Sequence, residues 1–139
     1  MSHESLPQFL AKVDLFAGLS KETLSDLIAR GTTLSIKPGA HATEQGSADA
    51  GLQVVLEGTA EVTVNGEDRA PLGPGDYFGE ISLIDGLPRS ATVVAGPEGL
   101  TTFALSTLAF APVVKANPEV AYELLKALAT RVRSLESQA

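Results

Sequence analysis

Hydrophobic and polar positions follow two different periods along the chain, and glycines mark where the period changes. Near the N-terminus, apolar residues recur at helical spacing, first over residues 6–13 and then in a second helix that ends at Gly31. All but one of the 13 glycines lie between Gly31 and Gly99, where short strands and turns are predicted. Helical spacing returns after Ser106, and a final helix begins at Pro118. The predicted order is helices, many short strands, then helices.

The central segment contains short runs of apolar and polar residues separated by turn residues. Runs with a strand pattern lie at residues 52–57, 59–65, 90–95 and 100–105. Asn65 and Gly66 form the strongest hairpin signal, because both positions accept a positive φ. Many short strands in a small domain predict a mainly β fold with flanking helices. We expect a β-roll or jelly roll of about eight antiparallel strands, with N-terminal helices and a C-terminal helix pair.

Length and composition favour one globular domain. The chain has 139 residues, of which 44% are hydrophobic and 19% are charged, a balance typical of folded domains. We expect a single domain over residues 1–139, with helices at 1–31, the β-roll at 32–105 and C-terminal helices at 106–139. The sequence contains no recognisable helix-turn-helix, kinase or channel segment, so we expect a stand-alone module.

Cysteine content and charge exclude several classes of function. The chain has no cysteine, which excludes disulfides, Cys-ligated zinc, iron–sulfur clusters and thiol catalysis. The net charge of −7 argues against nucleic acids and anionic membranes as partners. No apolar run approaches the roughly 20 residues that span a bilayer. The first residues lack the regions of a signal peptide, so a cytoplasmic protein is expected.

One segment between two predicted strands carries the candidate chemistry. Residues 80–85 can form only one or two helical turns before Gly86 ends them, and the backbone N–H groups at a helix start suit an anion. Gly79 lets a ligand approach the backbone, and the Arg89 guanidinium could bind two oxygens of one phosphate. Because a carboxylate repels phosphate, Glu80 is better suited to accept from neutral hydroxyls, such as those of a ribose. Together these groups indicate a nucleotide.

The same segment resembles the phosphate-binding cassette of cyclic-nucleotide-binding domains. This family includes the sensor half of the bacterial catabolite activator protein, kinase regulatory subunits and cyclic-nucleotide-gated channels. Its cassette has the approximate pattern F-G-E-[LI]-[AS]-L-x-x-x-x-P-R-[STA]-A-x-V, which this sequence matches over residues 78–93. The resemblance covers nearly the whole chain and includes residues 15–20, Pro38 with Gly39, the strand pair around Gly58 and residues 72–76.

The resemblance implies a role for most cassette residues. Glu80 would accept from the ribose 2′-hydroxyl, and Arg89 would hold the cyclic phosphate. Backbone N–H groups near Gly79, Glu80 and Ala91 would complete the phosphate site, and Ser90 would add a hydroxyl. In the family, Thr at the Ser90 position tends to accompany cGMP, and Ala or Ser tends to accompany cAMP, so cAMP is the implied ligand and cGMP the second candidate. The implied ligand-binding residues are Phe78, Gly79, Glu80, Ile81, Ser82, Arg89, Ser90 and Ala91.

Two segments depart from the family pattern. Residues 41–44 are less apolar than the family's strand at this place, so an edge strand is expected there. The final helix has no aromatic residue near its end to cap the nucleotide base, since Tyr122 lies early in it. The candidates for a capping residue are Leu125, Leu128 and Arg131.

The final helix also carries a heptad seam. Its members are spaced 4, 3, 4 and 3 residues apart and are Ala121, Leu125, Leu128, Val132 and Leu135. This stripe could form a homodimer, or it could pack on the protein's own β-roll, and the sequence leaves both alternatives open.

Each cassette residue also has a simpler explanation when it is taken singly. Glu80 could be a favourable acid in a helix's first turn, Arg89 could pair with Asp85 on the surface, and Ser90 could be an ordinary strand residue. His41 is the only histidine in the roll, and we find no nucleophile–base pair, so no catalytic residue, metal or cofactor is expected.

The sequence therefore predicts a non-catalytic module that binds a cyclic nucleotide, with cAMP favoured. Such a module senses or sequesters the nucleotide and passes a movement of its C-terminal helix to an unknown protein partner. The alternatives are an interaction domain of the same fold that binds no nucleotide, and a sensor for a different small ligand.

Overall fold

The structure, a computed structural model, describes residues 5–47 and 51–137. The chain divides into two compact units, one made of residues up to Ala29 and from Ala111 onward, the other of Arg30–Phe110. No helix in the described part of the chain is long and apolar enough to cross a membrane.

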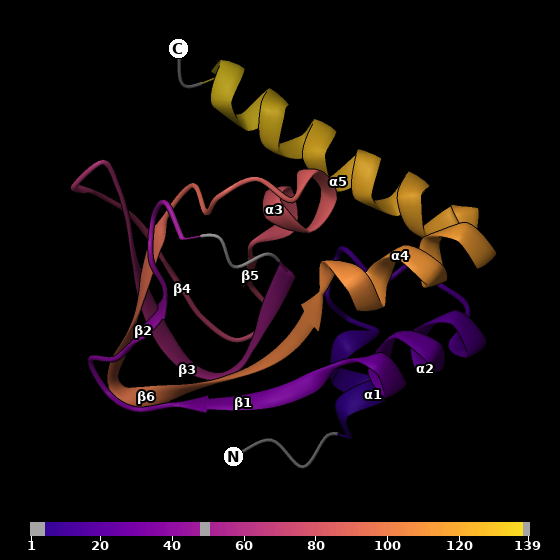
Figure 1. The fold of residues 1–139 in the computed structure, drawn as a ribbon, viewed down its shortest axis with the longest axis horizontal. Coiled ribbons are helices and arrows are strands. Elements are labelled where there is room, and N and C mark those ends of the chain that lie inside the picture. The colour runs from indigo at the N-terminus through magenta and orange to yellow at the C-terminus, as the bar shows by residue number, and fades with distance from the viewer. Residues whose placement is uncertain (1–4, 48–50, 138–139) are drawn as a thin grey trace. The chain divides into compact units, whose positions relative to one another are not determined.

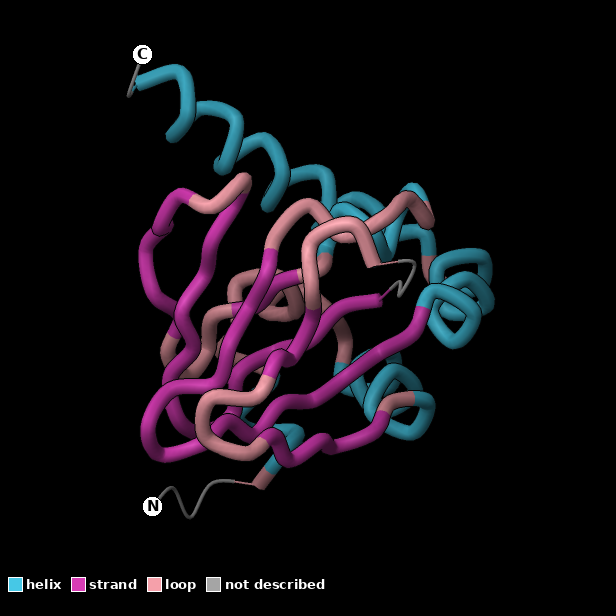
Figure 2. The backbone as a smooth tube through the Cα atoms, turned by 60° about the vertical axis from the view of Figure 1, so that its left-hand side comes forward, coloured by secondary structure: helices cyan, strands magenta, loops and turns pink. Residues whose placement is uncertain are grey.

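The unit Arg30–Phe110 is built on one antiparallel sheet (Figure 1). Its strands are β1 (Thr32–Ile36), β2 (His41–Thr43), β3 (Gly51–Val64), β4 (Glu67–Leu72), β5 (Tyr77–Phe78) and β6 (Thr92–Ser106). Their order is β1-β6-β3-β4, with β2 paired to β6 and β5 paired to β3. The turns and loops that join the strands are visible in Figure 2. The mainly β fold with flanking helices is confirmed, and β2 lies at an edge, since β6 is its only strand partner in the described ranges.

Two bends explain why the described residues form six strands where about eight were predicted. The two strands predicted on either side of Gly58 are one strand, β3, because Gly58 bends the chain at a φ of +86° while pairing with β6 continues on both sides. A Cβ atom at Gly58 would collide with the Gly99 carbonyl, so this close approach requires glycine. The strands predicted on either side of residues 96–99 also merge, because these residues form a bulge opposite Thr59 within β6.

Apolar side chains of the strands form a core that reaches the candidate segment. The buried cluster comprises Val55, Ala60, Phe78, Val93, Ala95 and Leu100. One polar pair is also buried, and in it the Thr102 hydroxyl donates to Gln53 Oε1 at 2.9 Å. Because this pair satisfies the hydrogen-bonding groups it buries, the sheet can carry it without a large desolvation cost.

The helices of the other unit come from both ends of the chain. They are α1 (Leu6–Leu10), α2 (Lys21–Arg30), α4 (Thr107–Ala116) and α5 (Pro118–Ser137), of which α2 ends and α4 begins within the strand unit. The Thr23 hydroxyl of α2 lies 3.1 Å from Asn117 Oδ1 and 3.1 Å from Glu119 Oε1. These contacts connect α2 to the start of α5. The predicted C-terminal helix pair is α4 and α5.

Candidate functional site

The short helix α3 (Glu80–Asp85) lies between β5 and the irregular segment that precedes β6. Gly79 before it has a φ of +86°, and Gly86 after it has a φ of +68°, both in the left-handed region that glycine adopts without strain. Leu83 N–H donates to the Gly79 carbonyl at 2.9 Å, and Gly86 N–H donates to the Ser82 carbonyl at 2.9 Å. The predicted helix is confirmed with the same bounds, because the two glycines fix its ends.

Arg89 lies after α3 and is buried, with 7% of its surface exposed. Its Nη1 donates to the Gly51 carbonyl at the start of β3, at 2.5 Å. A Cβ atom at Gly79 would collide with both Arg89 Nη1 and the Gly51 carbonyl. Gly79 therefore serves two purposes, a left-handed φ and the space in which the guanidinium lies. This burial contradicts the alternative of an exposed Arg89–Asp85 ion pair.

The other cassette residues divide into buried and exposed sets. Glu80 and Ser82 on α3 are each 4% exposed. Phe78 is 8% exposed and its side chain belongs to the core cluster. Ile81 is 44% exposed, Ser90 is exposed and Ala91 is half-buried. The polar side chains that this segment buries are thus Glu80, Ser82 and Arg89.

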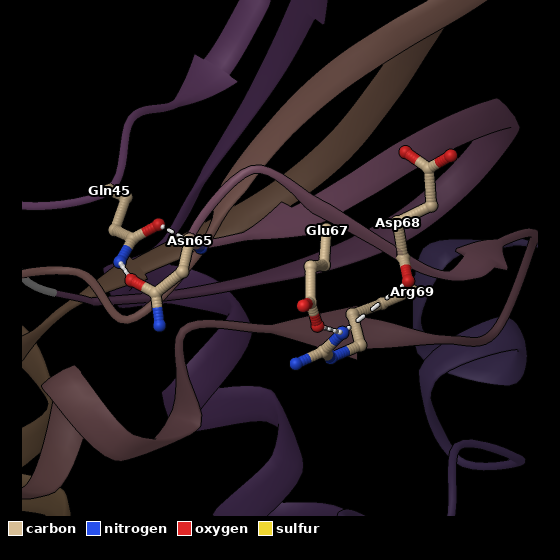
Figure 3. A network of polar contacts seen from close by, with 5 residues as sticks. All are labelled: Gln45, Asn65, Glu67, Asp68 and Arg69. Carbon is tan, nitrogen blue, oxygen red and sulfur yellow. Dashed lines mark hydrogen bonds and ion pairs between the residues drawn. The ribbon is translucent and has the colours of Figure 1, made fainter.

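The loop after β2 holds the backbone of Arg89, although no sequence pattern indicated this contact. Gly46 N–H donates to the Arg89 carbonyl at 2.9 Å, and Arg89 N–H donates to the Ser47 carbonyl at 2.9 Å. The preceding residue, Gln45, exchanges hydrogen bonds with Asn65 in the β3–β4 turn (Figure 3). Arg89 is therefore fixed through its backbone by one loop and through its guanidinium by β3.

Residues 33–117 of the chain match the family described as the cyclic nucleotide-binding domain. The chain belongs to this family. The matched range contains the cassette and the strands β2 to β6. The family resemblance inferred from the cassette is thereby confirmed.

Two curated relatives illustrate this family of cyclic nucleotide-binding domains. The chain is 38% identical over 89 residues to a cAMP-dependent protein kinase regulatory subunit of Yarrowia lipolytica, covering 63% of this chain and 24% of that protein. It is 32% identical over 120 residues to a cyclic nucleotide-gated potassium channel of Rhizobium etli, covering 86% of this chain and 33% of the channel. The chain thus spans a third or less of the length of either relative.

Solved structures of cyclic nucleotide-binding domain relatives share the fold. The catabolite activator protein of Thermus thermophilus superimposes with a TM-score of 0.79 at 31% identity, covering 90% of this chain and 61% of that one. The N-terminal domain of a transcriptional regulator from Streptomyces coelicolor has a TM-score of 0.78 at 30% identity, with 94% of each chain covered. The strand arrangement of the domain is therefore that of the catabolite activator protein.

The residues predicted to cap the base lie on α5, in the helical unit of the cyclic nucleotide-binding domain. Leu125 is 63% exposed, Leu128 is half-buried and Arg131 is exposed. Two further members of the heptad seam, Val132 and Leu135, are 52% and 67% exposed. The capping and dimer roles of these residues stay predictions.

A charged group lies beside the seam on the same helix. Lys126 Nζ is 2.5 Å from Glu123 Oε2 and 5.0 Å from the centre of the Tyr122 ring. The hydrogen bond that the Lys126 ammonium donates to the Glu123 carboxylate raises the pKa of Lys126 above its ordinary value. The Lys126 ammonium thus lies beside both the Glu123 carboxylate and the Tyr122 ring.

The arrangement of potential metal-ligating side chains bears on whether the described part of the domain could hold a metal ion. Over residues 5–47 and 51–137, no three or more His, Cys, Asp or Glu side chains are placed to hold a metal ion. His41 Nδ1 lies 2.9 Å from Glu44 Oε1 at the surface.

Proposed function

We propose that this chain is a non-catalytic, cytoplasmic sensor that binds cAMP reversibly and binds cGMP more weakly. The observation that carries the proposal is the burial of Glu80 and Arg89, 4% and 7% exposed, within one short segment. One short segment thus buries a guanidinium, which can donate two hydrogen bonds to an anion, and a carboxylate, which can accept from a hydroxyl, and a cyclic nucleotide presents both of these groups. The names of the relatives, a cAMP-dependent kinase subunit and a cyclic nucleotide-gated channel, support the same ligand class.

Each charged residue has a defined task in this proposal. The planar guanidinium of Arg89 holds two oxygens of the cyclic phosphate, a geometry that an ammonium group does not offer. Glu80 accepts a hydrogen bond from the ribose 2′-hydroxyl. Backbone N–H groups near Gly79, Glu80 and Ala91 bind the phosphate, and the exposed Ser90 hydroxyl adds a further donor. A side chain at Gly79 would collide with the Arg89 guanidinium, so glycine there lets Arg89 keep the position from which it holds the phosphate.

A ligand panel tests the proposal directly. Thermal unfolding and titration calorimetry are measured with cAMP, cGMP, linear 5′-AMP and no ligand. At about 100 times its Kd, cAMP is expected to add about 2.7 kcal/mol to the free energy of unfolding. We expect cGMP to add less and 5′-AMP to add nothing measurable. If neither cyclic nucleotide binds, the chain is an interaction domain of the same fold or a sensor for another ligand.

The Glu80 assignment predicts a preference for the ribose hydroxyl. Wild-type protein is expected to bind 2′-deoxy-cAMP about 10- to 150-fold more weakly than cAMP, since a hydrogen bond to a charged group contributes about 1.5–3 kcal/mol. Glu80→Gln should narrow this ratio, because a neutral acceptor is weaker, and Glu80→Ala should remove most of it. Competition binding gives all six affinities. A ratio that Glu80→Ala leaves unchanged would show that Glu80 is only a helix-start acid.

We also propose that the bound nucleotide orders α5 and that a protein partner, or a second copy, detects this change. The seam residues Leu125, Val132 and Leu135 are more than half exposed, so covering them would remove apolar surface from water. Amide hydrogen exchange is expected to show that cAMP protects residues 124–135 as well as residues 79–91. Protection confined to residues 79–91 would favour sequestration, and sedimentation with and without cAMP would identify a dimer.

A further inference from the structure

Two amide side chains connect the loop after β2 to the turn between β3 and β4. Gln45 Nε2 donates to Asn65 Oδ1 at 2.7 Å, and Asn65 N–H donates to Gln45 Oε1 at 2.8 Å. Figure 3 shows the two dashed bonds closing a ring between these residues. The Gln45 N–H donates to Thr92 Oγ1, at the start of β6, at 2.9 Å. Gln45 is therefore held by the turn and by β6.

The residues after Gln45 carry this connection to Arg89. Gly46 N–H donates to the Arg89 carbonyl and Arg89 N–H donates to the Ser47 carbonyl, both at 2.9 Å. Arg89 lies outside any helix or strand, in the segment between α3 and β6. Because no regular element fixes that segment at Arg89, its backbone position depends on this exchange with the loop. A shift of the loop would move the Arg89 backbone while Gly51 still holds its side chain.

We infer that the Gln45–Asn65 pair is a positioning device for Arg89, which presets the guanidinium for the cyclic phosphate. This inference rests on the proposed function, because it assumes that Arg89 binds the nucleotide. Neither amide touches the ligand in this scheme. The pair contributes by removing conformations of the loop in which Arg89 is misplaced, and such preorganisation lowers the ordering cost of binding.

The simpler explanation for Asn65 is turn geometry alone. Asn65 has a φ of +53° and Gly66 a φ of +79°, the left-handed pair that a tight hairpin needs. Asn65→Gly keeps this conformation and removes the side-chain acceptor. Asn65→Asp keeps both the tolerance of a positive φ and an acceptor oxygen for Gln45 Nε2. Comparing the two variants therefore separates the effect of the turn conformation from the effect of the side-chain hydrogen bond.

The test measures cAMP affinity in these variants and in one matched control. Gln45→Ala is expected to weaken binding about 2- to 12-fold, the range of one neutral hydrogen bond. Asn65→Gly should weaken it less, and Asn65→Asp should behave like wild type. Arg69→Ala is the control, because its side chain hydrogen-bonds to Glu67 and to the Asp68 carbonyl on the same hairpin, as Figure 3 shows. We expect no change of affinity in Arg69→Ala.

A double-mutant cycle separates positioning from general stability. If the pair acts through Arg89, Gln45→Ala should lower cAMP affinity only slightly in a protein that already carries Arg89→Ala. If the alanine variant does not fold, Arg89→Lys is used as the background instead. An equal loss in both backgrounds would overturn the inference.

Amide exchange of the ligand-free protein gives a readout that needs no nucleotide. Exchange at the Gly46 and Arg89 N–H groups should rise in Gln45→Ala and in Asn65→Gly, and should not rise in Arg69→Ala. Unchanged exchange would overturn the inference whatever the affinities. Faster exchange in a protein that binds no cyclic nucleotide would uphold the link between the loop and Arg89 and would refute the proposed function instead.

Discussion

Arg89→Ala is expected to weaken cAMP binding about 10- to 150-fold, because charge-assisted hydrogen bonds worth about 1.5–3 kcal/mol are lost. The loss should be similar for cGMP, since the phosphate is common to both ligands. Arg89→Lys should lie between wild type and alanine, because lysine keeps the charge but not the planar pair of donors. Titration calorimetry measures each affinity directly.

The Arg89 variants need a control for folding, since the side chain is 7% exposed and binds the Gly51 carbonyl. Circular dichroism and thermal unfolding without ligand show whether the sheet survives. Arg69→Ala, at the surface of the β3–β4 hairpin, controls for the loss of a positive charge. A folded Arg89→Ala protein that binds cAMP like wild type would refute the phosphate assignment.

Gly79→Ala is expected to lower the free energy of unfolding by about 2–5 kcal/mol. About 1–2 kcal/mol comes from forcing a side chain into the left-handed region, and about 1–3 kcal/mol from overpacking against Arg89 and the Gly51 carbonyl. Nucleotide affinity should fall as well, because Arg89 must move to make room. Urea unfolding monitored by circular dichroism measures the stability change.

Gly86→Ala is the matched control for this substitution. Gly86 ends the same helix with a φ of +68°, but a Cβ atom there meets nothing within 4 Å. Its alanine variant should therefore lose only the conformational part, about 1–2 kcal/mol. If Gly79→Ala and Gly86→Ala lowered the free energy of unfolding equally, overpacking beside Arg89 would contribute nothing to the stability change.

Local sequence patterns were sufficient wherever the cause of a feature is local. The helix α3 has its predicted bounds because Gly79 and Gly86 stop it on both sides. The strand number differed because Gly58 has the sequence signature of a turn, while the chain there only bends and keeps its pairing with β6. Whether a glycine bends or ends a strand depends on a partner far along the chain.

Long-range contacts explain what the sequence did not reveal in the site. Arg89 reaches the Gly51 carbonyl, and Gln45 reaches Asn65, only because β3, β4 and β6 bring distant loops together. The sequence pattern explained Asn65 by its place in a turn, and nothing in that pattern indicated its contact with Gln45. The family resemblance gave positions but not orientations, so it did not indicate that the Phe78 side chain packs in the core.

Pairing between strands that lie far apart in the sequence determines when the chain can fold during synthesis. Thr32 of β1 pairs with Ala104, and Gly51 of β3 pairs with Ser106, so both strands depend on the last strand to be made. Folds dominated by such distant pairs acquire their structure slowly, in roughly milliseconds to seconds. Until β6 has left the ribosome, β3 can pair with β4 and β5 but lacks the strand with which it makes its longest pairing. The nascent chain is then at its most vulnerable to aggregation, and chaperones matter most at that stage.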